Sequence, residues 1–178
     1  MAILVCAFCM PSMAQHLKFM GIPLNGTITE FQQKLAAKGV VHDKAASAMV
    51  DKGTRLFKGR FAGSDATIVV WYDTNTKYVR SAKAFITCYS KNSRDNKYAE
   101  LKSMLLEKYD NMPFKTETED DLETLYITVT DDSGLMVIGI IKLYRMKVDF
   151  SYDEHTVHVE YSDFINSSKH QKSKMDDL

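Results

Sequence analysis

Residues 66–72, Ala-Thr-Ile-Val-Val-Trp-Tyr, followed by the return stretch at residues 77–88, decide the fold class. β-Branched and aromatic residues dominate the first stretch, which is typical of a β-strand. Residues 73–76, Asp-Thr-Asn-Thr, lie between the two stretches and are turn formers. The pattern predicts an antiparallel hairpin, and residues 53–63 are expected to form a further strand before it.

A helix is predicted upstream of these strands, over residues 28–38. Thr27 and Glu30 have the spacing of a capping box, in which each side chain accepts a hydrogen bond from the backbone of the other residue. Gly39 is a suitable helix end. The apolar residues that recur at helical spacing are Ile28, Phe31 and Leu35.

The second half of the chain repeats this order. Asn96 is expected to cap a second helix near residues 97–109, and strands follow it. Residues 135–143 are apolar at nearly every position, so they should lie centrally in a sheet. The strands expected in this half are residues 123–130, 135–143, 146–152 and 155–162.

The register of the last two strands can be predicted. A two-residue loop at Asp153-Glu154 would pair apolar residues on one face of the hairpin and opposite charges on the other. The expected pairs are Phe150 with Val157, Val148 with Val159, Met146 with Tyr161, Asp149 with His158 and Lys147 with Glu160.

These elements predict an α+β fold made of two helix-then-antiparallel-strand units in tandem, with the helices packed on one face of an antiparallel sheet. The repeat-like units are expected near residues 27–90 and 96–165, within a single domain over residues 15–165. Residues 166–178 have almost no apolar side chains and are expected to be disordered.

The first 14 residues predict export. Residues 2–10 are apolar and uncharged, and small residues at Ser12 and Ala14 suit cleavage between Ala14 and Gln15. No Lys or Arg precedes the apolar run, and a buried N-terminal strand or helix is the alternative. The run is too short to cross a membrane, and no other stretch has the required length of about 20 residues.

The cysteines fit this interpretation. Cys6 and Cys9 lie within the expected signal, which leaves Cys88 alone and excludes an internal disulfide. Val5 and Phe8 precede the first two cysteines, whereas a lipid anchor needs a small residue there, so lipid anchoring is not favoured. A periplasmic or secreted protein is therefore expected, with Cys88 as a structural residue.

Composition narrows the function classes. Lys and Arg number 23, as do Asp and Glu, so the formal charge is zero and a nucleic-acid partner is not expected. No P-loop, dinucleotide-binding, serine-hydrolase or zinc-protease motif is present. The sequence therefore favours a protein that is not an enzyme, and it identifies no catalytic residue and no cofactor.

Metal binding is not expected either. His155 and His158 would point to opposite faces of a strand. The acidic segments at residues 117–121 and 131–134 lack the alternating ligands of a calcium loop, so they are expected to be a solvated loop and a turn.

Three residues form the candidate binding surface. If the turn centres on Thr74-Asn75, Trp71 and Tyr78 lie opposite each other, and they share the outer sheet face with Arg80. Trp, Tyr and Arg are common interface anchors. The alternative is that helices or the N-terminal segment cover them. The residues expected on the core face are Ile68, Val70, Val79 and Phe85.

Three short motifs carry a family resemblance. They are the opening F-x-G-I-P-L-x-G at residues 19–26, F-x-G-x-F-A-G at residues 57–63 and L-x-x-K-Y at residues 105–109. They resemble a group of uncharacterised secreted proteins from gut bacteria of the Bacteroidetes type. The helix-then-strand order is similar to that of the β-lactamase inhibitor protein and of the small lipoprotein of the outer-membrane assembly machine. Both are binding modules, although similar folds do not fix function.

The sequence therefore predicts a secreted or periplasmic, non-catalytic binding module for a protein or glycan that the sequence does not identify. The alternatives are a structural or assembly factor of the envelope, which would co-purify with membrane proteins, and an enzyme with an unrecognised site. The enzyme would need a pocket with convergent titratable groups. The oligomeric state does not follow from the sequence.

Overall fold

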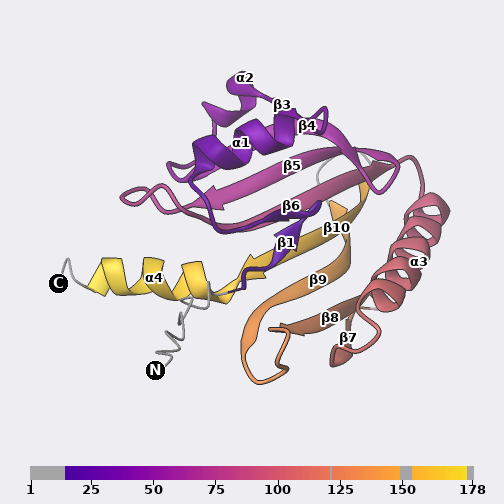
Figure 1. Cartoon of the computed structure of the whole chain (residues 1–178). Helices are drawn as coiled ribbons and strands as arrows, with labels where there is room; N and C mark the ends of the chain where they lie inside the picture. The colour runs from indigo at the N-terminus through magenta and orange to yellow at the C-terminus, as the bar shows by residue number, and fades with distance from the viewer. Residues whose placement is uncertain (1–14, 121, 149–153, 176–178) are drawn as a thin grey trace, which may run out of the picture.

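The computed structural model describes residues 15–120, 122–148 and 154–175. Its centre is an eight-stranded sheet with the order β3-β4-β5-β6-β10-β9-β8-β7 (Figure 1), in which every neighbouring pair is antiparallel. The strands are β3 (Val41–His42), β4 (Thr54–Phe61), β5 (Ser64–Tyr72), β6 (Val79–Cys88), β7 (Phe114–Glu119), β8 (Leu122–Thr130), β9 (Val137–Val148) and β10 (Glu154–Asp163).

The described residues also form four helices and a small hairpin outside this sheet. The hairpin is β1 (Lys18–Phe19) with β2 (Ile22–Pro23), and the helices are α1 (Ile28–Ala36), α2 (Lys44–Ser47), α3 (Lys91–Lys108) and α4 (Phe164–Met175). In Figure 1, α1 and α2 lie beside the β4–β5 half of the sheet, and α3 lies beside the β8–β9 half. The predicted α+β class with a largely antiparallel sheet is confirmed.

One face of the sheet forms the core together with α1 and α3. Residues at alternate strand positions share a face, and the buried ones on this face include Ile68, Val70, Ala84, Val159, Leu143 and Leu125. Gln32 of α1 accepts a hydrogen bond from Arg55 of this face at 2.7 Å. Tyr98 of α3 lies under the guanidinium of Arg145, 4.5 Å from ring centroid to Cζ. We term this surface the helix face.

The predicted first helix is confirmed. The Thr27 backbone N–H donates to Glu30 Oε2 at 2.7 Å, and the Glu30 N–H donates to Thr27 Oγ1 at 3.4 Å, which completes the capping box. Ile28, Phe31 and Leu35 are all buried. Gly39 follows the helix with a φ of 78°, the left-handed conformation that favours glycine.

The second helix begins earlier than predicted. The N-cap of α3 is Ser90, whose side chain accepts from the Ser93 N–H at 3.1 Å, and Asn96 lies inside the helix. The first turns bury Arg94, which pairs with Asp95 at 2.9 Å, and Asp95 also accepts from Arg145 at 3.0 Å. The apolar periodicity therefore starts only after this charged contact, and this explains why the pattern placed the helix start too late.

The predicted register of the last hairpin is wrong by five residues. Val159 faces Leu143, Tyr161 faces Ile141 and His158 faces Tyr144. The proposed pairs of Val148, Met146 and Lys147 with Val159, Tyr161 and Glu160 do not form, and Phe150 and Asp149 lie outside the described residues. Because the first residues of β9, Val137–Ile141, are apolar on both faces, a longer connection lets Ile141 and Leu143 enter the core instead.

Two segments expected to lack regular structure have it. Residues 114–119 form β7, an exposed edge strand that includes the first three residues of the acidic segment at 117–121. The tail expected to be disordered from residue 166 forms most of α4, and Asn166 is buried. The sequence pattern missed α4 because its attachment is polar and comes from residues distant in the chain.

The expected signal at residues 1–14 lies outside the described residues. Within the described part, no helix is both long enough and apolar enough to span a bilayer. The same part contains no cluster of three or more His, Cys, Asp or Glu side chains arranged to hold a metal ion.

Candidate aromatic binding face

The sheet face opposite the helix face carries aromatic and charged side chains from six strands. They are Trp71, Lys83, Phe85, His158, Glu160, Lys142, Tyr144, Tyr126 and Lys115, and we term this surface the aromatic face. Within the ranges that the structure describes, no helix residue makes a hydrogen bond, aromatic contact or cation–π contact with these side chains. They contact one another instead.

A charged row crosses the aromatic face at right angles to the strands. Its members lie opposite one another in five consecutive strands, in the order Lys83, Glu160, Lys142, Tyr126 and Lys115. The ammonium groups of Lys115 and Lys142 lie 5.1 and 5.8 Å from the centroid of the Tyr126 ring. Lys83 lies 5.2 Å from the Trp71 ring. Each of the three lysines thus lies near an aromatic ring, Lys83 near Trp71 and the other two near Tyr126, and such rings attract positive charge through their π-faces.

His158 lies next to this row, between two aromatic rings. Its ring stacks on Tyr144 at 4.8 Å and meets the edge of Phe85 at 4.7 Å. Its Nε2 is 2.9 Å from Thr156 Oγ1, while Nδ1 is buried without a hydrogen-bond partner among the described residues. Burial, assisted by the charge of Lys83, lowers the pKa of His158 to about 4, so the ring is neutral at pH 7.

Tyr144 also stays neutral. Burial raises its pKa to about 12, and the nearby Glu160 carboxylate adds to the rise. At pH 7 the His158 imidazole is therefore a weak base next to a phenol that keeps its proton, and both pKa values lie far from the operating pH at which general acid–base catalysis is most efficient.

A hollow of about 540 Å³ continues the aromatic face at its β4–β6 corner. Phe85, Thr67 and Thr87 line its floor, with Lys58 and Tyr89 also lining the hollow. Tyr89 is fully exposed. Phe85 belongs to both the hollow and the ring contact with His158, so a ligand in the hollow would also reach the aromatic face.

The three predicted site residues lie in or next to the β5–β6 hairpin. Trp71 lies on the aromatic face and is partly exposed. Tyr78 lies in the β5–β6 turn with 44% of its surface exposed, and Arg80 is half-buried with Nε lacking a partner among the described residues. Neither Tyr78 nor Arg80 makes a hydrogen bond, aromatic contact or cation–π contact with Trp71 in the described part of the chain.

The expected pairing of Trp71 with Tyr78 is wrong for two reasons: the turn centres one residue later than expected, on Asn75-Thr76, and the hairpin contains a β-bulge. Trp71 faces Ser81 while Tyr72 faces Val79, which leaves Arg80 as the extra residue. The bulge also changes which face the later β6 residues occupy. Phe85, expected in the core, therefore lies on the aromatic face, whereas Ile68, Val70 and Val79 are buried as predicted.

Sequence reasoning missed Phe85, His158, Tyr144 and Tyr126 as members of one surface. A partial signal existed for Tyr126, because the alternation in residues 123–130 already placed it away from the core. The others required the register between β6, β10 and β9, which no local pattern supplies.

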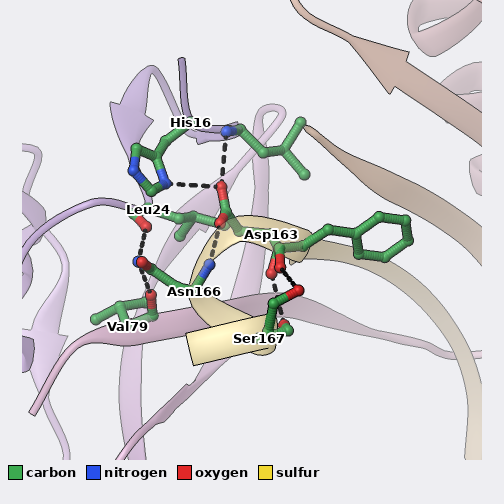
Figure 2. A network of polar contacts seen from close by, with 9 residues as sticks. His16, Leu24, Val79, Asp163, Asn166 and Ser167 are labelled. Carbon is green, nitrogen blue, oxygen red and sulfur yellow. Dashed lines mark hydrogen bonds and ion pairs between the residues drawn. The ribbon is translucent and has the colours of Figure 1, made fainter. Parts of the chain in front are cut away.

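Two histidine–carboxylate pairs elsewhere resemble catalytic dyads, and the first is His16 with Asp163 at 3.1 Å (Figure 2). Asp163 is fully buried and also accepts from the backbone N–H groups of Leu17 and Asn166 at 3.0 and 2.9 Å. Ser167, the neighbouring hydroxyl, donates to the Asp163 backbone carbonyl and not to His16. The pair therefore fixes the N-terminal segment to α4, and among the described residues His16 makes no hydrogen bond to a nucleophilic side chain.

The second pair is His170 with Asp73. Burial raises the pKa of Asp73, but hydrogen bonds from His170, Thr76 and Asn75 outweigh this and hold the pKa well below its usual range. The Asp73 carboxylate accepts hydrogen bonds from the backbone N–H groups of Asn75 and Thr76, at 2.8 and 2.6 Å. It closes the β5–β6 turn and attaches α4 to it, which is a structural role.

Comparison with known proteins adds no relative. No family model matches the chain, and neither the curated proteins nor the solved structures contain a significant match.

Proposed function

We propose that the protein is an exported, periplasmic or secreted, non-catalytic binding module whose aromatic face holds a protein or glycan partner. The observation that carries the proposal is the charged row across five strands, whose three lysines lie against the rings of Trp71 and Tyr126, on the face opposite α1 and α3. Partly exposed Trp and Tyr rings are typical anchors of binding surfaces. Of the three residues predicted for this role, Trp71 is the one that contacts a member of the charged row, because its ring lies next to Lys83.

The test is a binding comparison between the wild-type chain and Trp71→Ala. Both are used as bait against envelope and culture-medium fractions and on a glycan array. Phe114→Ala is the matched control, because Phe114 is an exposed aromatic residue of β7 outside the aromatic face. Loss of a ligand with W71A alone, at an unchanged melting temperature, supports the proposal. A ligand that W71A retains in full, or a W71A protein that no longer folds, places the site elsewhere.

Export is part of the proposal and has its own measurement. Intact-mass analysis of the protein from its native cells should give a chain beginning at Gln15. A cytoplasmic protein that retains residues 1–14 would contradict export.

We further propose that the chain is a tandem repeat. In support, α1 is followed by the consecutive antiparallel strands β4 to β6, and α3 is followed by β7 to β10. Superposition of residues 27–90 on residues 96–165 in an experimental structure tests this. Equivalent positions for α1 and α3 relative to their strands are expected, and unrelated positions would exclude a repeat.

A further inference from the structure

A second cavity lies on the helix face, separate from the aromatic face. It has a volume of about 330 Å³ and is bounded by α3, by β10 and by two hairpin turns. Met20 belongs to the turn between β1 and β2, and Ala62 belongs to the turn between β4 and β5. The two turns are more than 40 positions apart in sequence, since residue 20 and residue 62 differ by 42, and they meet over the same part of the sheet.

Both turns have the same construction. Met20-Gly21 has φ values of 52° and 76°, and Ala62-Gly63 has values of 46° and 79°. Two successive positive φ values are characteristic of the tight type I′ hairpin turn. A phenylalanine precedes each turn, and these two rings, Phe19 and Phe61, stack at 5.5 Å with an interplanar angle of 17°. Phe61 lines the cavity, and the ring of Phe19 packs against it from outside the lining.

The interior of the cavity is apolar. Val159 and Tyr161 of β10 line it, and Leu101 and Leu105 of α3 form the opposite wall, all of them buried. Methionine side chains lie at two positions around it, Met20 and the half-exposed Met104. Methionine adapts its shape to different apolar ligands, as in promiscuous binding surfaces.

Lys108 supplies the charge of this cavity. It is exposed on the last turn of α3 and is the one charged residue of the lining. Its Nζ lies 5.1 Å from the centroid of the Tyr109 ring. Among the residues that the structure describes, no carboxylate lies within ion-pair distance of Lys108. An apolar interior with a cation at its edge is complementary to a molecule with an apolar body and an anionic end.

We propose that this cavity binds a short anionic amphiphile, with the aliphatic chain between α3 and the two turns and the carboxylate or phosphate head at Lys108. The volume sets the length of the chain. At about 30 Å³ for a group of the size of water, 330 Å³ holds on the order of ten such groups. A chain of about eight to ten carbon atoms fits this space, and a volume above about 300 Å³ is within the range of ligand pockets.

The test uses the full chain with three probes of equal length: decanoate, decanol and decyltrimethylammonium. Binding is followed by calorimetry and by the chemical shifts of ¹³C-labelled methionine methyl groups, below the concentrations at which the probes form micelles. Decanoate should bind saturably and shift the Met20 and Met104 signals, decanol should bind more weakly, and the cationic probe should bind least. Equal binding of the three probes, or no saturable binding of decanoate, would overturn the proposal.

Two variants locate the site. Lys108→Gln should weaken decanoate binding about tenfold, because a charge-assisted contact is lost, while Lys108→Arg should retain it. Met104→Trp should block the cavity without unfolding the chain, because Met104 is half-exposed. Binding that is unchanged in both K108Q and M104W would overturn the proposal. The cavity shares no residue with the aromatic face, so either site can fail without affecting the other.

Discussion

His158 lies between the rings of Phe85 and Tyr144 as a neutral imidazole, because burial lowers its pKa to about 4 from the ordinary value of 6.5. Between pH 6.5 and pH 4 the unfolded chain therefore binds a proton that the folded chain does not bind. The stability that this residue contributes is present above pH 6.5 and is lost as the pH falls through this window. We expect a loss on the order of 2 kcal/mol in the free energy of unfolding.

Urea unfolding at pH 7.5 and pH 4.5 measures this difference. His158→Phe should show a smaller drop between the two values, because its ring fits between the same neighbours and does not titrate. If the wild type and H158F lose equal stability on acidification, His158 is not the group responsible.

Asn166 is a second residue with a measurable effect. Its side-chain amide donates to the backbone carbonyls of Leu24 and Val79 at 2.6 and 2.8 Å (Figure 2). Asn166→Ala removes both of these buried hydrogen bonds, and we expect it to lower the free energy of unfolding by about 2–4 kcal/mol. Ser168→Ala is the control, because the exposed Ser168 hydroxyl bonds only within α4. Similar losses in the two variants would contradict the assigned role of Asn166.

At the scale of elements, the start of α3 can be tested directly. Ser90→Ala removes the oxygen that caps the helix and should cost about 1 kcal/mol. Asn96→Ala replaces an exposed residue inside the helix with a better helix former, so it should cost nothing. Chemical denaturation of the two variants separates these outcomes, and a larger loss for N96A would restore the helix start that the sequence suggested.

The elements also show what local sequence patterns can and cannot predict. The α1 capping box and the β-former content of residues 66–72 are local, and both predictions hold. The early turns of α3 escape prediction because Arg94 is buried against Asp95, and Asp95 is held by Arg145 from β9. The register of β9 against β10 was not predictable because the first residues of β9, Val137–Ile141, are apolar on both faces, so several registers bury similar apolar area.

In the candidate site, too, the parts set by local sequence could be predicted and the parts set by strand pairing could not. Trp71 belongs to a strand that the composition identifies, and it was predicted on the outer face. The position of Phe85 on the aromatic face depends on the β-bulge between β5 and β6. His158 contacts Phe85 and Tyr144 only because β10 pairs with β6 and with β9 in one particular register. A surface assembled from six strands is a property of the sheet, which a single stretch of sequence does not contain.

At the scale of the whole molecule, α4 joins the two ends of the described chain to the sheet. Asn166 contacts Leu24 in the segment after β2 (Figure 2). His170 contacts Asp73 at the β5–β6 turn, and Asp163, the last residue of β10, accepts a hydrogen bond from the Leu17 backbone N–H. A chain shortened to residues 1–163 should lose several kcal/mol of stability, since these buried polar groups lose their partners. A chain shortened to residues 1–171 keeps all these contacts and should melt within a few degrees of the wild type. Equal melting temperatures for the two shortened chains would show that α4 contributes nothing.

The strand order has a kinetic consequence. Within the described sheet, β6 and β10 are the one neighbouring pair that does not follow directly in sequence, while β3 to β6 and β7 to β10 each form a continuous meander. Contacts within a meander close short loops and form quickly, whereas the β6–β10 contact must close a loop of more than 60 residues, as its first pair joins Cys88 to His155. The rate of refolding should therefore depend on how fast the two preformed meanders pair with each other through β6 and β10.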